Sequence, residues 1–177
     1  MGKRIQKKKD LKSVFLFLLK LNLFLLPFYA IIYFDVTYYP IQIAFSWVVF
    51  FLTNLIGMNV KMDGAMLYIG ESNYPVYISF DCIGWKSSYS LIALVLASPG
   101  FFREKAAFIA KWVPVIIIIN IARVVIAIGS GVLINFEFMK ALHDYIMQPA
   151  MILIVFLIWS SYIKSLGKED KIYSIRK

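Results

Sequence analysis

The stretch Ala106–Ile128, AAFIAKWVPVIIIINIARVVIAI, decides the fold class of this chain, because it is apolar over the length that a membrane crossing requires. A helix needs roughly 20 mostly apolar residues to cross a hydrocarbon core about 30 Å thick. Lys111, Asn120 and Arg123 interrupt the stretch, and an arginine this far into an apolar helix is costly enough to suggest a functional role. The stretch therefore predicts a membrane-spanning helix that carries a working polar residue.

Four further segments are apolar over a similar or shorter length: Val14–Phe34, Ile41–Gly57, Trp85–Ala97 and Tyr145–Ile163. The second is short, and its polar or small residues Gln42, Ser46, Thr53 and Gly57 fall on one helical face. This pattern favours a helix in the outer membrane interface, with a full crossing as the alternative. We therefore predict an all-α polytopic membrane protein, a single domain over residues 1–177 built as a compact bundle of about four or five helices.

The composition excludes most soluble classes of protein. The chain is 61% hydrophobic and 16% charged, whereas a globular chain is about 45–50% apolar and about 25% charged. Its net charge of +9 lies in short basic blocks between apolar runs, so we expect no nucleic-acid partner. A single cysteine excludes a disulfide framework and a cysteine-rich metal site, and we expect neither a metal nor a cofactor.

The basic blocks predict the orientation of the chain in the membrane. They lie in the N-terminal residues 1–13, in the loop after Pro99 and in the tail, residues 164–177. By the positive-inside rule all three face the cytoplasm, and residues 59–81 then lie outside. The first apolar segment is too long for a signal peptide and lacks a clear cleavage site, so we interpret it as an uncleaved anchor.

Residues 59–81 have the pattern of short strands rather than of a helix. Asp63-Gly64 and the stretch 70–73 are turn signals. Val76, Ile78 and Phe80 alternate with less apolar residues, as in a half-buried strand. We predict a small extracytoplasmic β-hairpin or meander that leads directly into Asp81 and Cys82.

Three chemically reactive side chains are predicted to lie at a similar depth. The chain has one cysteine, Cys82, and one histidine, His143. From the helical rise, Cys82 and Arg123 lie roughly 24 Å and His143 roughly 30 Å above the cytoplasmic side. The three side chains should therefore meet at the outer boundary of the bilayer.

Their chemistry suits attack on a carbonyl group. A cysteine is activated at a helix N-terminus or beside a cation, and Cys82 has both options. His143 could take the thiol proton, and Arg123 could hold a substrate carbonyl or stabilise an oxyanion. Asn120 could orient the guanidinium, whereas Asp81 would oppose thiolate formation unless it points to water.

Each residue also has an ordinary structural interpretation. A lone cysteine is usually an inert buried thiol, a lone histidine often caps a helix, and an arginine can reach outward to water. The non-enzymatic alternative is a helix-bundle scaffold or transporter subunit. A lipid-phosphate phosphatase is disfavoured, because such sites usually need two histidines and the chain has one.

Asp81-Cys82-Ile83-Gly84, Asn120-Ile-Ala-Arg123 and His143, in this order and context, resemble the exosortase/archaeosortase family of membrane-embedded cysteine transpeptidases. The resemblance covers about residues 40–165. It implies a catalytic triad of Cys82, Arg123 and His143, with Gly84 part of the cysteine motif. Ile83 departs from the family pattern, which usually has a small residue there.

The resemblance also implies a function. Such an enzyme cleaves the C-terminal sorting signal of secreted, membrane-anchored proteins, which consists of a motif, a transmembrane helix and a basic tail. It forms a thioester and transfers the substrate to a lipid or another envelope acceptor. The implied partners are these sorting signals and membrane lipids. The implied location is the cell membrane, with several crossings, an extracytoplasmic active site and cytoplasmic termini.

Overall fold

The structure is a computed structural model that describes residues 2–70 and 73–175. The elements follow in the order α1 (Gly2–Tyr33), α2 (Tyr39–Leu55), β1 (Lys61–Asp63), β2 (Met66–Ile69), β3 (Tyr74–Tyr77), the 3₁₀ turn η1 (Phe80–Ile83), α3 (Trp85–Ala97), α4 (Phe102–Leu133), α5 (Phe136–Ala141), the π-helical segment η2 (Leu142–Met147) and α6 (Gln148–Ile175). Side chains are described for residues 11–70 and 73–166. The basic segments predicted to be cytoplasmic, 1–13 and 164–177, lie largely outside these residues.

Three helical segments among the described residues are long and apolar enough to cross a membrane: Leu11–Tyr33, Phe102–Leu133 and Phe136–Leu166. Helix α3 has 13 residues and covers about 20 Å, which is less than a hydrocarbon core of about 30 Å. The prediction of a polytopic helical membrane protein with a small β-sheet is confirmed.

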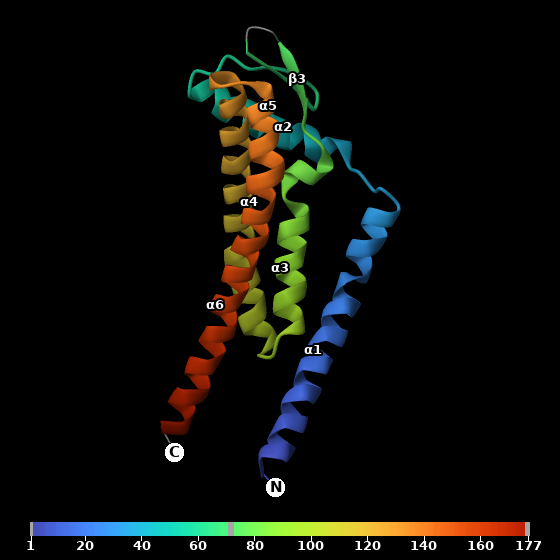
Figure 1. Ribbon diagram of the computed structural model, residues 1–177, viewed down its shortest axis with the longest axis vertical. Coiled ribbons are helices and arrows are strands. Elements are labelled where there is room, and N and C mark those ends of the chain that lie inside the picture. Colours follow the sequence, from blue (N-terminus) through green and yellow to red (C-terminus); the bar gives the residue numbers. More distant parts are fainter. Residues whose placement is uncertain (1, 71–72, 176–177) are drawn as a thin grey trace.

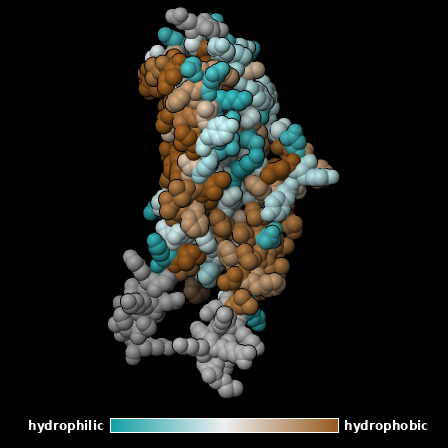
Figure 2. Space-filling model, in the orientation of Figure 1, coloured by the Kyte–Doolittle hydropathy of each residue, from teal (hydrophilic) through white to brown (hydrophobic). Residues whose placement is uncertain are grey.

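The long helices run roughly along one axis, and the small elements gather at one end of it (Figure 1). The sheet, α2 and α5 lie at the upper end, whereas both chain ends and the turn between α3 and α4 lie at the lower end. This arrangement is the one expected if the three basic blocks share one side of the membrane. Figure 2 shows hydrophilic residues in the upper half of the visible face, at the level of η1, with hydrophobic surface on both flanks.

Helix α2 crosses the upper end of the molecule instead of running alongside the long helices (Figure 1). Its polar residues Gln42, Ser46 and Thr53 are buried, whereas Trp47 and Phe51 are exposed. The Thr53 hydroxyl donates to the carbonyl oxygen of Val49 at 2.8 Å, which satisfies it inside its own helix. The polar stripe found in the sequence therefore faces the protein, together with the buried Phe45 and Val49, and the opposite face of α2 exposes apolar side chains.

The predicted meander is an antiparallel sheet in the order β1-β2-β3. Met66 of β2 pairs with Tyr77 of β3, and Leu67 pairs with Val76. Because β3 has β2 as its one neighbour in this order, it is an edge strand. Leu67 and Ile78 are fully buried in a core that includes Ile128 of α4. Because Ile78 also donates its backbone N–H to Ala65 at 2.9 Å, the chain enters η1 from a fixed point beside α4.

A second core joins the lower parts of α3, α4 and α6. It is built from buried side chains of the three helices, among them Leu91, Ile116 and Val155. Helix α1 packs on α3, where the Tyr89 hydroxyl donates to the carbonyl oxygen of Phe24 at 2.8 Å. These contacts fix α3, and with it the turn that carries Cys82, against α4 and α6.

The last crossing begins earlier than the sequence predicted. Asn135 caps a helix at Phe136, because its side-chain oxygen accepts a 2.7 Å hydrogen bond from the backbone N–H of Phe138. The helix then continues through the π-helical segment η2 into α6. His143 is thus about two turns inside a helical segment and not at its start, and the π-helical turn sets its direction.

Candidate active site

Cys82 lies in a short turn whose shape depends on Gly84 and Asn120. Gly84 has φ +85°, a conformation that favours glycine, and it ends η1 and begins α3. The Asn120 side chain of α4 donates from Nδ2 to the carbonyl oxygen of Cys82 at 2.6 Å. A Cβ atom on Gly84 would lie 2.8 Å from the Asn120 side chain, so this close approach needs glycine. The turn is therefore held by α4 as well as by the sheet.

The surroundings of the Cys82 sulfur favour the thiolate. Its Sγ lies 3.4 Å from the hydroxyl oxygen of Ser79. Burial raises the pKa of the Cys82 thiol, but hydrogen bonding to His143 and Ser79 and the charge of His143 together outweigh burial, so that the pKa is lowered. The thiol therefore ionises more readily than an ordinary cysteine.

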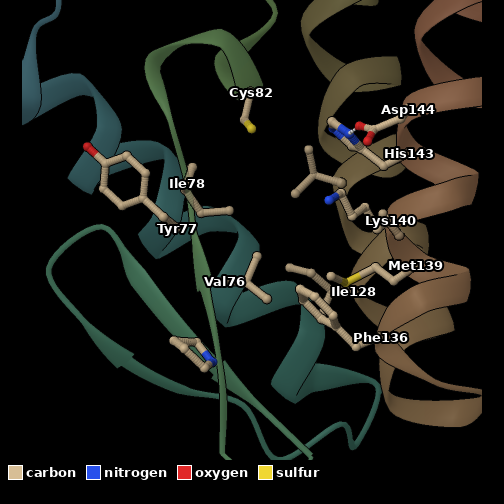
Figure 3. A pocket seen from close by; sticks show the side chains of 13 residues that line it. Val76, Tyr77, Ile78, Cys82, Ile128, Phe136, Met139, Lys140, His143 and Asp144 are labelled. Carbon is tan, nitrogen blue, oxygen red and sulfur yellow. Dashed lines mark hydrogen bonds and ion pairs between the residues drawn. The ribbon is translucent and has the colours of Figure 1, made fainter.

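His143 faces the cysteine from η2, across one end of a pocket (Figure 3). Its Nδ1 lies 3.1 Å from a carboxylate oxygen of Asp144, and its side chain is 28% exposed. A neutral ring that donates its Nδ1 proton to Asp144 leaves Nε2 as the acceptor for a thiol proton. The contact with Asp144 thus constrains the imidazole on its Nδ1 side.

Arg123 lines the same cavity as the cysteine and the histidine. This cavity has a volume of about 400 Å³ and is bordered by Cys82, Arg123 and His143, with Ser87, Asn120 and Met151 further in. The Nε atom of Arg123 and the Oδ1 atom of Asn120 are buried and have no hydrogen-bond partner among the described residues.

Asn120 has a different contact from the one considered in the sequence, where it could orient the Arg123 guanidinium. Its amide nitrogen donates to the backbone of Cys82, and its Oδ1, the atom that could accept from the guanidinium, has no hydrogen-bond partner among the described residues. Asn120 is 1% exposed and lies one turn before Arg123 on α4. Its hydrogen bond therefore connects the turn that carries Cys82 to the helix that carries Arg123.

Asp81 is exposed and paired with a cation, although it borders the same cavity as Cys82. One of its oxygens lies 2.7 Å from Nζ of Lys86, and its side chain is 59% exposed. The indole N–H of Trp85 donates to its other oxygen at 3.4 Å. The sequence suggested that Asp81 would oppose thiolate formation unless it points to water. Its carboxylate is exposed to water, so this condition is met.

Comparison with known proteins identifies the family. The model of the transmembrane exosortase family matches residues 8–159, a range that contains Cys82, Arg123 and His143. The chain belongs to the transmembrane exosortase family. Neither the curated proteins nor the solved structures compared with the chain gave a match.

Two residues at the site of this exosortase were missed by the reasoning from sequence. Ser79 contacts the sulfur, and Asp144 contacts the imidazole. Both lie close in sequence to a predicted site residue, Ser79 three positions before Cys82 and Asp144 directly after His143. That proximity was the available signal, but serine and aspartate at such positions serve equally well in turns and helix caps.

The exosortase site has no side-chain arrangement for binding a metal. Among the side chains that the structure describes, those of residues 11–70 and 73–166, no three His, Cys, Asp or Glu are grouped so that they could hold an ion. The chemistry available from its own residues is a thiolate, an imidazole with an oriented proton, and a guanidinium.

Proposed function

We propose that this exosortase-family protein is a membrane-embedded cysteine peptidase and transpeptidase that cleaves C-terminal sorting signals. The observation that carries the proposal is the single cavity shared by Cys82, His143 and Arg123. A nucleophile, a proton carrier and a fixed positive charge around one space are the groups that acyl transfer requires.

In the first step the Cys82 thiolate attacks a peptide carbonyl carbon of the substrate, after His143 has taken the thiol proton. A C–S bond forms, and the carbonyl oxygen becomes an oxyanion that the Arg123 guanidinium stabilises. The C–N bond then breaks, and the imidazolium returns its proton to the leaving amine. The products are a thioester on Cys82 and a released C-terminal segment.

In the second step an acceptor resolves the thioester. A lipid amine, another envelope nucleophile or water attacks the thioester carbonyl while His143 takes the acceptor's proton. The C–S bond breaks and the thiolate is restored, with the proton on His143 ready for the next cycle. The acceptor that reaches the thioester decides whether the outcome is transfer or hydrolysis.

The position of the cavity agrees with such a substrate. It lies toward the end of the bundle that carries the sheet and opposite the chain termini, the end that we assign to the extracytoplasmic side (Figure 1). A sorting signal that ends in a transmembrane helix would present its cleavable bond at this level, just outside the bilayer.

The test is co-expression with candidate anchored proteins, followed by mass measurement of their new C-termini. Cys82→Ala and Cys82→Ser should abolish processing while the protein remains inserted in the membrane. Ser161→Ala, on the exposed side of α6 and remote from the cavity, is the control and should process normally. Normal processing by Cys82→Ala would exclude the proposed nucleophile and favour a scaffold role.

A further inference from the structure

A second, apolar cavity meets the catalytic one at the cysteine and the histidine. It has a volume of about 230 Å³ and includes both Cys82 and His143 in its lining. Figure 3 shows these two side chains at one end of the pocket and Phe136, Met139 and Val76 at the other. The candidate nucleophile therefore lies between two spaces of different character.

Three separate segments of the chain line both cavities, and each of them gives the same order of the two cavities along the long axis of the molecule. On α4, Asn120 and Arg123 line the polar cavity, whereas Ala127 and Ile128 line the apolar one. Residues 120 and 128 are about 12 Å apart along a helix. Because α4 ascends toward the sheet, the apolar cavity lies on the outer side of Cys82 (Figure 1).

The other two segments agree with α4. On the descending helix, Met139 lines the apolar cavity, His143 lines both, and Met151 lines the polar one. Along the chain from β3, Val76 borders the apolar cavity and Gly84 the polar cavity. The order from outside to inside is thus apolar cavity, Cys82–His143 pair, polar cavity.

We propose that the apolar cavity binds the side chain of the substrate residue whose carbonyl Cys82 attacks, and that the polar cavity receives the leaving segment. This inference rests on the proposed function. A C-terminal membrane anchor continues inward from the cleaved bond, so its first residues occupy the inner cavity. The acyl side must then extend outward, where the apolar cavity lies.

The lining of the outer cavity defines the side chain that fits. Val76, Ile78, Ile128, Phe136 and Met139 supply apolar walls. Lys140 and Asp144 border the cavity on the side of His143, and the ring of Tyr77 borders it from β3 on the opposite side. Ala127 is 5% exposed, and its small side chain leaves open a volume that a larger residue would fill. The cavity therefore selects a large apolar side chain such as leucine or phenylalanine over glycine.

The experiment uses acetyl-aminoacyl vinyl sulfones with glycine, alanine, leucine or phenylalanine as the amino acid. The thiolate adds to the alkene carbon that takes the place of the substrate carbonyl carbon, β to the sulfone. A C–S bond forms there as the alkene π bond breaks, and the imidazolium supplies the proton to the carbon next to the sulfone. The rate of mass gain on the full-length protein in detergent or lipid measures how well each side chain fits. We expect the leucine and phenylalanine probes to react at least about tenfold faster than the glycine probe.

Two variants and a control connect this preference to the outer cavity. Ala127→Phe should remove the preference for leucine and phenylalanine, whereas Ala122→Phe, one of the exposed positions of the same helix, should keep it. Phe136→Ala enlarges the cavity without adding atoms to the core, and should shift the preference further toward phenylalanine. Phe136→Ala therefore provides the test of the outer cavity if the Ala127→Phe variant does not fold.

The outcomes separate this inference from the proposed function. If Cys82 reacts with all four probes at equal rates, or if Phe136→Ala and Ala127→Phe leave the preference unchanged, the acyl-side assignment is wrong although the nucleophile stands. If Cys82 reacts no faster than cysteine in solution with any of these probes or with iodoacetamide, the proposed function itself fails.

Discussion

Asn120 of α4 donates a 2.6 Å hydrogen bond from Nδ2 to the carbonyl oxygen of Cys82. One turn further along the same helix, Arg123 faces the cavity that contains the sulfur. A single side chain therefore couples the position of the candidate nucleophile to that of the candidate oxyanion-stabilising residue. Because Asn120 is buried, no water competes for its amide.

Replacing Asn120 by aspartate tests this coupling. Asn120→Asp is nearly the same size but places a second acceptor against the Cys82 carbonyl, so the turn should separate from α4. We expect processing to fall by about tenfold or more, with a larger effect on kcat than on KM. Asn120→Gln, which keeps the donor, should restore part of kcat. Equal losses in the two variants would indicate that Asn120 is needed only for folding.

Gly84→Ala should impair the site more than its backbone strain alone explains. An alanine at φ +85° costs about 1–2 kcal/mol, and its Cβ would in addition lie 2.8 Å from Asn120. Gly57→Ala is the matched control, because Gly57 has φ +80° and no atom within 4 Å of an added Cβ. The two variants should lose similar stability from strain, and only Gly84→Ala should lose most of its processing. Thermal unfolding and substrate mass measurement together distinguish them.

Much of the fold was predictable because lipid restricts the choice of structure. Apolar runs of membrane-spanning length become helices, and the predicted meander is present. Its last strand ends at Tyr77, however, so the alternating run through Phe80 leaves the sheet and enters η1 before Asp81. The inward-facing polar stripe of α2 was not predictable, since the sequence period shows that Gln42, Ser46 and Thr53 share a face but not what covers it. The π-helical turn at His143 also has no sequence signal, because tertiary packing sets it.

The candidate site was predictable where the residue types are rare. A single cysteine, a single histidine and a deep arginine attract notice in an apolar chain, and the structure places all three around one cavity. Ser79 and Asp144 escaped notice because such residues are common in turns and helix ends. Their roles depend on side-chain directions that only the folded η1 and η2 define.

The reactivity of Cys82 should persist below the pH at which ordinary thiols react. Its pKa in the folded protein lies below that of an ordinary thiol. The thiolate is therefore present at a lower pH than in an ordinary cysteine, and it is lost only as the pH falls through the lowered pKa. The measurement is the pH dependence of alkylation by iodoacetamide, followed by intact mass. A midpoint at or above that of a free cysteine peptide measured in the same buffers would contradict the lowered pKa.

Variants of the neighbours should move that midpoint in a defined direction. His143→Gln removes the main stabilising group while burial remains, so the midpoint should rise above the value of an ordinary thiol. Ser79→Ala should raise it by less. Asp81→Asn is the control and should leave it nearly unchanged, because Asp81 is exposed and paired with Lys86. An equal rise in all three variants would point to a general disturbance of the turn.

Arg123→Lys should lose most of its turnover while retaining a reactive cysteine. The guanidinium presents several N–H donors in a fixed plane, and an ammonium cannot reproduce that geometry at a developing oxyanion. We expect processing to fall by about 10²–10³-fold, whereas alkylation of Cys82 by iodoacetamide, which forms no oxyanion, should change by no more than a few-fold. Lys111→Arg, the reverse exchange at an exposed position near the inner end of α4, should leave both unchanged. Full processing by Arg123→Lys would mean that the residue contributes only a positive charge or an anchor at the membrane boundary, and the oxyanion would then need another donor.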